Sequence, residues 1–273
     1  MERISSMGKT VIFNLAFLFF LSCGPKVDTN KLGQIREDDP ILTEQEVNKL
    51  IDSENQMSVG TIGILVYDGF FNLDAFGPHS VLSGLIGTEV LLIAEKKGKV
   101  KTSSGVEIYV DNSIDEVEQL DILLIPGGTT GTVNTSKNDK ILKWIRKIDS
   151  TSTFTTSVCT GAWILGEAGL LQNKKATTNW YRAKDRIESY GGKFLQERYV
   201  RDGKLWTSAG VSAGIDMSLA LVNAIKGETY TKLLMLNLEY DPKPPVIGGS
   251  VNNTNKGLVN YMSQMYDSAL GSK

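Results

Sequence analysis

Three short, almost continuous apolar runs and one β-branched run mark the strands that the sequence predicts. A run with few polar positions is typical of a strand whose two faces are both buried. These runs cover residues 61–67, 89–94, 121–125 and 153–157, and a shorter strand is predicted at 106–110.

Segments with helical spacing of apolar residues alternate with these strands. Helices are predicted over 72–82, 137–148, 179–189, 210–225 and 228–238, and a hairpin turning at Asp202-Gly203 is predicted over 199–208. In the first helix, Asn72 is expected as the N-cap and Pro78 as a break or a kink. The alternation favours one α/β domain, with a parallel sheet and helices on each side, and no internal repeat.

The first residues are predicted to be an export signal rather than part of the fold. Residues 1–22 contain a basic start and an apolar run of eleven, which is too short for a membrane span of roughly 20 residues. The sequence FLSCG that follows resembles the bacterial lipoprotein box, so Cys23 is the expected lipidation site. The protein is then exported and anchored to a membrane in the bacterial cell envelope. The alternative is a conventional cleaved signal or an uncleaved anchor.

The remaining boundaries follow from changes in composition. Residues 23–57 are polar and charged, and are predicted to form a tether with a short helix at 43–53. The folded domain is placed at 58–248. Residues 249–273 form a C-terminal extension with one amphipathic helix, 256–270.

Charge and residue counts exclude some partners and sites. The net charge of −2 provides no basic excess for phosphates, which argues against nucleic-acid binding. Two cysteines, Cys23 and Cys159, and one histidine, His79, are too few for a Cys/His zinc site, and no metal is expected. With Cys23 lipidated, Cys159 is the remaining thiol, so an intramolecular disulfide is excluded. Acid–base chemistry then depends mainly on carboxylates.

Cys159 is the candidate nucleophile because it stands at a strand-to-helix turn. Gly161 and Ala162 follow it and leave room for a tight bend, as in a nucleophile elbow. The N-terminus of the next helix is expected to stabilise the thiolate and lower its pKa. The alternative is a buried structural cysteine.

Two further segments are expected beside Cys159, because the carboxyl ends of parallel strands meet at one edge of the sheet. Asp74 is the candidate acid–base group, with a carboxyl that only interacts with the helix dipole as the alternative. Gly127 and Gly128 are expected to direct backbone N–H groups toward an oxyanion, together with the N–H of Thr160. The alternative for the two glycines is a simple turn. His79 is interpreted as a packed residue on another face of the helix.

Six motifs in order resemble the ThiJ/PfpI superfamily of class I glutamine amidotransferase-like proteins, and most resemble its isonitrile hydratase group. They are LDAFGP at 73–78, PGG at 126–128, SVCTGA at 157–162, ATTNW at 176–180, SAGVSAGID at 208–216 and EYDP at 239–242. The resemblance implies a flavodoxin-like three-layer sandwich with a mostly parallel central sheet and a nucleophile elbow. It also implies a homodimer that acts on a small molecule without metal or organic cofactor.

The same resemblance implies roles for the site residues. Cys159 would attack the terminal carbon of an isonitrile while Asp74 protonates it, and water would then release an N-substituted formamide. Thr160 would bind and polarise the reacting group, with Gly127 and Gly128 behind it. The resemblance also places Asn179 with Gly127 and Gly128 among the oxyanion or substrate-binding residues. The family has ATTHW where this chain has Asn179, which keeps hydrogen bonding but does not titrate near neutrality.

Three functions are compatible with these residues. The first is hydration of an isonitrile or a related electrophile. The second is amidase-like or glyoxalase-like hydrolysis by the same cysteine. The third is a non-catalytic, tethered binding or oxidant-sensing protein. A DNA-binding regulator is excluded, because the residues after Ile247 provide one short helix rather than a helix-turn-helix pair.

Overall fold

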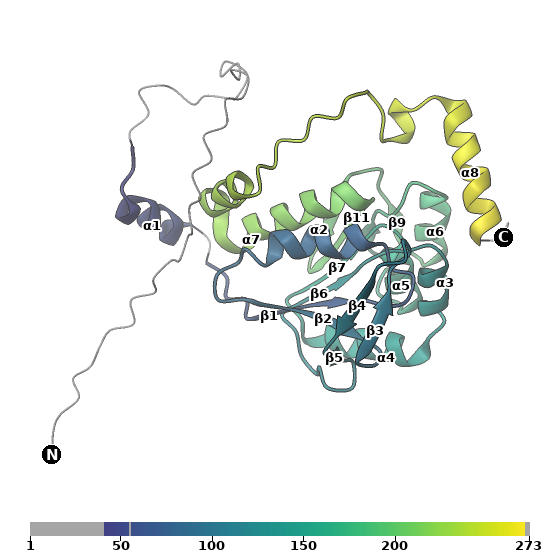
Figure 1. Cartoon of the computed structure of the whole chain (residues 1–273), viewed down its shortest axis with the longest axis horizontal. Coiled ribbons are helices and arrows are strands. Elements are labelled where there is room, and N and C mark those ends of the chain that lie inside the picture. Colours follow the sequence, from purple (N-terminus) through teal and green to yellow (C-terminus); the bar gives the residue numbers. More distant parts are fainter. Residues whose placement is uncertain (1–40, 55, 271–273) are drawn as a thin grey trace. The chain divides into compact units, whose positions relative to one another are not determined.

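A seven-stranded, mostly parallel sheet forms the centre of the computed structural model, which describes residues 41–54 and 56–270 (Figure 1). The chain from Glu44 onward is one compact unit. The strand order is β10-β11-β7-β6-β1-β2-β5, and only β10 runs antiparallel to its neighbour. The strands are β1 (Thr61–Leu65), β2 (Glu89–Ala94), β5 (Asn112–Ser113), β6 (Ile122–Ile125), β7 (Phe154–Val158), β10 (Tyr199–Asp202) and β11 (Leu205–Ser208).

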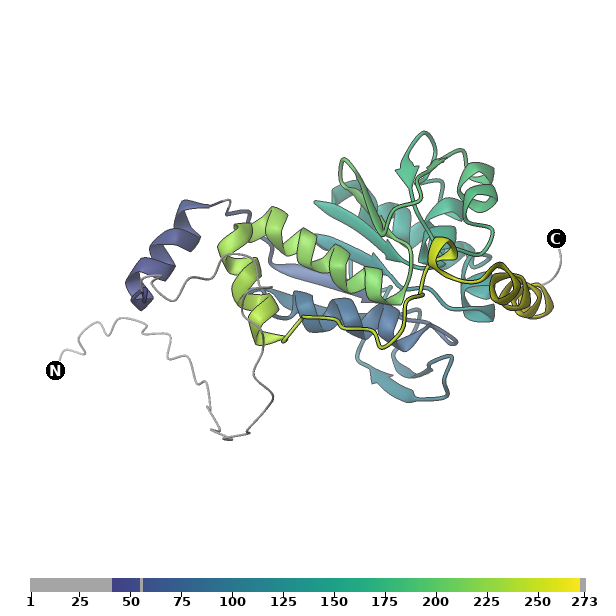
Figure 2. The same cartoon turned by 90° about the horizontal axis from the view of Figure 1, so that it is seen from above.

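Helices cover both faces of this sheet, as Figures 1 and 2 show. Helices α2 (Asn72–Leu82) and α7 (Val211–Asn237) pack against each other on one face. On the other face α5 (Gly161–Glu167) contacts β6 and β7 and packs against three further helices, α3 (Thr130–Thr135), α4 (Asp139–Thr151) and α6 (Ala183–Ser189). The predicted three-layer α/β sandwich of the flavodoxin-like type is confirmed.

The central strands are buried on both faces, as the apolar run of β6 and the β-branched run of β7 predict. All five residues of β7 and all four of β6 are buried. Both strands lie in the middle of the sheet, where helices remove each face from water. Burial of the apolar side chains of β6 and of Phe154 and Val158 in β7 contributes favourably to folding.

The predicted starts of two helices are wrong, and Pro78 does not break α2. The N-cap of α2 is Phe71 rather than Asn72, and Pro78 lies inside a helix that continues to Leu82. Helix α6 begins at Ala183, four residues later than predicted. The Asn179 Oδ1 accepts a hydrogen bond from the Tyr181 N–H (3.0 Å), which favours a turn, and Arg182 is left-handed (φ 49°).

The two predicted helices 210–225 and 228–238 form one element, α7, with a break at Gly227. Gly227 has φ 84°, a conformation that an L residue rarely adopts. Glu54, just after α1 (Glu44–Ser53), accepts hydrogen bonds from the Thr229 N–H (3.0 Å) and hydroxyl (2.5 Å) at this break. The predicted helix at 43–53 is therefore present and attached to α7.

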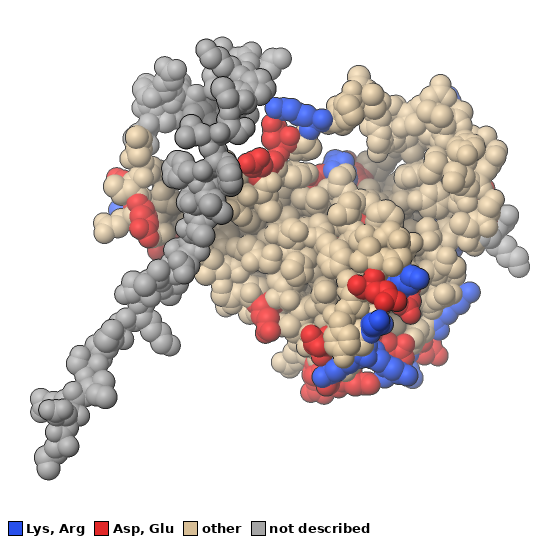
Figure 3. All heavy atoms as spheres, viewed as in Figure 1, with Lys and Arg blue, Asp and Glu red and all other residues tan. Residues whose placement is uncertain are grey.

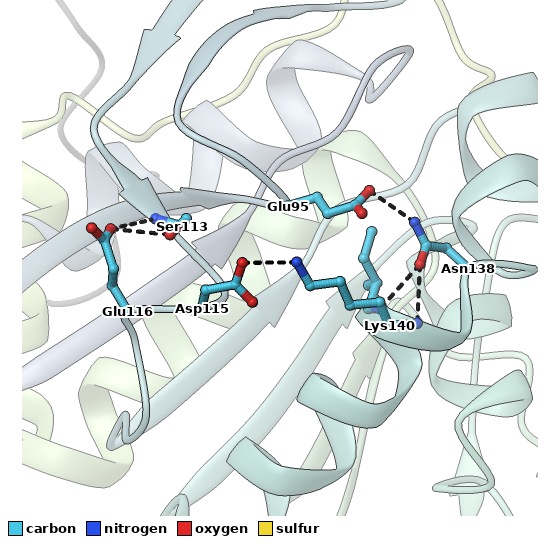
Figure 4. A network of polar contacts seen from close by, with 7 residues as sticks. Glu95, Ser113, Asp115, Glu116, Asn138 and Lys140 are labelled. Atoms are coloured by element: carbon cyan, nitrogen blue, oxygen red, sulfur yellow. Dashed lines mark hydrogen bonds and ion pairs between the residues drawn. The ribbon is translucent and has the colours of Figure 1, made fainter.

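A polar network fixes the start of α4 beside the ends of β2 and β5 (Figure 4). The Asn138 Oδ1 caps the helix by accepting from the N–H of Lys140 (3.1 Å), and its Nδ2 donates to Glu95 (2.9 Å). Lys140 also pairs with Asp115 at 2.8 Å. In Figure 3, charged side chains of both signs are interspersed over this part of the surface. No basic stripe is visible on that face.

The remaining elements lie at the periphery. They are the pairs β3 (Gly98–Lys101) with β4 (Glu107–Val110) and β8 (Lys175–Ala176) with β9 (Lys193–Phe194), a 3₁₀ turn (Val251–Asn253) and α8 (Lys256–Leu270). The helix predicted at 256–270 is confirmed. Among residues 41–54 and 56–270, no helix has the length and apolar character needed to cross a bilayer. The predicted export signal and Cys23 lie outside the described residues.

Candidate active site

Three adjacent strands bring the candidate residues together. β1, β6 and β7 are neighbours in the sheet, and their carboxyl ends lead to Asp74, Gly127 and Cys159 respectively. An isolated antiparallel bridge between Phe70 and Gly128 holds the first two connections side by side. The expected convergence at one edge of the sheet is present.

Cys159 lies in the left-handed region (φ 58°) between β7 and α5. Its backbone is fixed by two bonds: its N–H donates to the Ser208 carbonyl (3.0 Å), and the Thr178 hydroxyl donates to its carbonyl (2.8 Å). A side chain at Gly161 would lie 2.2 Å from the Ile125 carbonyl oxygen, so only glycine lets α5 start this close to β6. A non-glycine residue in this conformation costs about 1–3 kcal/mol, and the surrounding bonds hold it there. This is the geometry of a nucleophile elbow.

Asp74 is fully buried in the first turn of α2. Its Oδ2 accepts a hydrogen bond from the Gly127 N–H at 3.1 Å. Its Oδ1 has no conventional hydrogen-bond partner in the described part of the chain, although the carboxyl also interacts with the Cys159 thiol. Burial raises the pKa of Asp74 to about 7, because the Gly127 N–H and the thiol compensate only part of the lost hydration. The carboxyl can therefore both donate and accept a proton near neutral pH.

The expectation that the pKa of Cys159 is lowered is wrong. Burial and the negative charge of Asp74 raise the pKa of this thiol, and they outweigh the Thr160 N–H and the Asn179 amide, which both act to lower it. The start of α5 does lower the pKa of Cys159 through the Thr160 N–H, as expected. This effect is smaller than the rise in pKa caused by burial and by Asp74. At neutral pH the thiol keeps its proton beside a carboxyl that can take it.

Gly127 and Gly128 are arranged differently from the oxyanion site that their sequence predicts. The Gly127 N–H donates to Asp74, and the Gly128 N–H donates to the Thr160 hydroxyl (3.0 Å). That hydroxyl in turn donates to the Gly128 carbonyl (2.6 Å) and contacts the Thr132 hydroxyl (2.9 Å). Both glycines thus orient catalytic candidates, and the hydroxyl of Thr160 is occupied within the fold.

Asn179 adjoins the nucleophile, as its position in the motif predicts. Its Nδ2 donates to the Cys159 Sγ at 3.5 Å, and its Oδ1 holds the Tyr181 N–H. His79 is half-buried further along α2 and is not among the groups that shift the pKa of Cys159 or Asp74.

Sequence reasoning missed Thr132 and Tyr266. Thr132 lies in α3, a helix that the pattern did not predict, and also contacts the buried hydroxyl of Tyr67 (3.1 Å). Tyr266 lies in α8, more than one hundred residues after Cys159, and no local motif marks it. In the ranges 41–54 and 56–270, no group of three or more His, Cys, Asp or Glu side chains is arranged to hold a metal ion.

Comparison with known proteins agrees with these features. The sequence pattern of the DJ-1/PfpI family matches residues 61–224. Over 198 residues, covering 72% of this chain and 86% of the relative, the chain is 35% identical to an isonitrile hydratase of Pseudomonas putida. It is 30% identical over 149 residues to the deglycase TK1284 of Thermococcus kodakarensis, covering 54% of this chain and 87% of the relative. The crystal structure of a ThiJ/PfpI family protein from Pseudomonas syringae superposes with a TM-score of 0.78 and 29% identity, covering 86% of this chain and 95% of the other.

Proposed function

Because this chain belongs to the DJ-1/PfpI family, we propose that it is an enzyme with Cys159 as nucleophile, hydrating isonitrile-like small molecules to N-substituted formamides. One observation carries the proposal: a buried carboxyl with a pKa of about 7 interacts with a thiol that retains its proton. Adding a thiol to the terminal carbon of an isonitrile needs one sulfur nucleophile and one proton on that carbon. Cys159 and Asp74 supply this pair.

The first step forms a covalent thioimidate. The Cys159 Sγ bonds to the terminal carbon, and the thiol proton reaches the same carbon by way of Asp74, which leaves R–N=CH–S–Cys159. The Asn179 amide and the Thr160 N–H, which already interact with the sulfur, stabilise negative charge on it while the proton moves. The substrate carries no net charge, so no cationic anchor is required.

The second step releases the product. Water adds to the thioimidate carbon while Asp74 accepts one of its protons, which gives R–NH–CH(OH)–S–Cys159 once the nitrogen is protonated. The carbon–sulfur bond then breaks, the sulfur regains a proton, and R–NH–CHO leaves. A carboxyl with a pKa near the working pH is suited to serve as acid in one step and base in the next.

Formamide production from an alkyl isonitrile tests the proposal directly. Wild type is expected to form product, Cys159→Ala to form none, and Asp74→Asn to be about 10²–10⁴-fold slower, the usual contribution of a general acid–base. Asp68→Asn is the matched control, because it removes an exposed carboxyl from the connection after β1. A mass increase equal to that of the isonitrile on Cys159 would identify the thioimidate. Absence of product with wild type across linear, branched and aromatic isonitriles would overturn the proposal.

Hydrolase or deglycase activity is the second candidate, since the chain is 30% identical to a deglycase. The same variants measured with glycated thiols and amines distinguish it, because product from these substrates but not from isonitriles would favour it. An oxidant sensor would instead show reversible sulfenic acid on Cys159 and no formamide product from wild type.

We further propose that the protein is exported, lipidated on Cys23 and anchored to the envelope, and that it acts as a homodimer. The basis is the lipoprotein box and the family resemblance described above. Detergent phase partitioning of wild type and Cys23→Ala tests the anchor, and equal partitioning would overturn it. Light scattering on the Cys23→Ala protein gives the mass that tests the dimer.

A further inference from the structure

Helix α8 brings an aromatic side chain to the Cys159 site from the end of the chain. The side chain of Asn179 and the charges of Cys159 and Asp74 all affect the pKa of the Tyr266 phenol, so this phenol lies close to the nucleophile. Burial is the main cause that raises the pKa of Tyr266. Asn179, which donates to the Cys159 Sγ through its Nδ2, is thus also a neighbour of Tyr266.

Specific contacts attach α8 at this place. The ring of Tyr266 stacks on Tyr181 (centroids 4.9 Å apart, planes 20° apart) and meets Trp180 edge-on at 5.5 Å. The next residue, Asp267, accepts from the Tyr181 hydroxyl (2.5 Å) and pairs with Arg182 (2.6 Å). Trp180, Tyr181 and Arg182 directly follow Asn179 in the chain, so the segment that contacts the thiol also binds α8. In Figure 1, α8 lies beside α3.

We infer that Tyr266 is a specificity-determining residue of the Cys159 site, forming with Trp180 an aromatic wall that limits the width of the substituent the site accepts. Each aromatic ring presents a rigid, largely apolar surface. Arg182, which lies over the Tyr181 ring, is paired with Asp267, so this cation is already neutralised beside the wall. The substituent favoured by this wall is uncharged, apolar and narrow.

Two thiol reagents with the same reactive group test the wall without any substrate. N-methylmaleimide and N-phenylmaleimide both alkylate a thiol, and they differ in the width of the group that must pass Tyr266. The quantity measured is the ratio of their rate constants at Cys159, followed by peptide mapping so that Cys23 does not contribute. Because both rates depend on the same thiol, a change in the pKa of Cys159 cancels in the ratio.

Tyr266→Ala is expected to raise the phenyl-to-methyl rate ratio at least tenfold, whereas Tyr266→Phe, which keeps the ring, should leave it within twofold of wild type. Tyr261→Ala is the matched control, since Tyr261 lies on the same helix with 61% of its surface exposed. It should leave the ratio unchanged. An unchanged ratio in Tyr266→Ala, or an equal rise in Tyr266→Phe or Tyr261→Ala, would overturn the inference.

A second measurement extends the inference to turnover and rests on the proposed function. With a linear and a branched alkyl isonitrile, Tyr266→Ala should raise kcat/KM for the branched substrate relative to the linear one, mainly through KM. An unchanged branched-to-linear ratio in an active enzyme would refute the specificity role. Failure of the maleimide test refutes the wall, whereas failure of wild type to form formamide refutes only the proposed reaction. The two failures are therefore distinguishable.

Discussion

Replacing Asp74 by asparagine tests two effects of the buried carboxyl: it lowers the stability of the folded protein, and it transfers protons in the proposed reaction. Asparagine has nearly the same shape, and its Oδ1 can still accept the hydrogen bond from the Gly127 N–H. It cannot carry a negative charge, and it neither donates nor accepts the proton that the proposed reaction needs. The variant should therefore be more stable than wild type at neutral and alkaline pH and much less active.

The size of the stability change follows from the pKa. The pKa of Asp74 rises from 3.8 to about 7 on folding, so between these values the folded state binds more protons than the unfolded state. The contribution of Asp74 to the free energy of unfolding must then fall as pH rises through this window, by up to about 1.4 kcal/mol per pH unit. The whole shift corresponds to about 4 kcal/mol, which is an upper value reached above pH 7. The asparagine side chain does not titrate in this range, so the Asp74→Asn variant lacks this slope.

Urea unfolding of both proteins at intervals from pH 4 to pH 8 measures this slope. The stability of Asp74→Asn minus that of wild type should be small at pH 4 and should grow steadily to pH 7. Asp68→Asn controls for the loss of a carboxylate near the same end of β1. A difference that does not vary with pH would refute the reasoning, because it would mean that the pKa of Asp74 is the same in the folded and unfolded states.

Three further predictions concern the surroundings of this pair. Because Asp74 raises the pKa of Cys159, iodoacetamide should alkylate Cys159 faster in Asp74→Asn than in wild type at pH 8; an equal or slower rate would contradict that coupling. Thr160→Val leaves the buried N–H of Gly128 without its partner, whereas the Gly128 carbonyl still accepts from the Thr132 hydroxyl (3.0 Å). Urea unfolding should therefore show a loss of about 1–3 kcal/mol, and unchanged stability would contradict the role of the hydroxyl. Gly161→Ala forces a methyl group against the Ile125 carbonyl oxygen at the start of α5 and should lower the free energy of unfolding by about 1–3 kcal/mol. A calorimetric Tm equal to that of wild type would contradict this, because it would show that the elbow has room for the methyl group.

The raised pKa of the Cys159 thiol means that the nucleophile is protonated before substrate binds. A cysteine at a helix start is often treated as a preformed thiolate, yet here burial and one nearby carboxyl outweigh the N–H of Thr160. A neutral thiol beside a proton acceptor is suited to adding sulfur and hydrogen to one carbon.

The sequence by itself determined the elements whose cause is local. The apolar runs at 61–65 and 122–125 became strands buried on both faces, and the residues after Cys159 produced an elbow because a small residue is required at Gly161. The order of motifs around Asp74 and Cys159 also identified the family. In each case the information lies in residues that are close in sequence, through periodicity, size or the backbone conformation that a residue permits.

Only the tertiary structure decided the pKa values of the site residues and which side chains surround Cys159. The pKa of Asp74 depends on burial and on one N–H more than fifty residues away, and neither can be counted along the chain. The Gly127 N–H points to that carboxyl rather than into open space, although the sequence favoured an oxyanion role. Tyr266 reaches Asn179 because α8 packs on Tyr181 and Arg182. Such contacts depend on the three-dimensional path of the chain, because hydration loss and charge interaction act over distance in space rather than along the sequence.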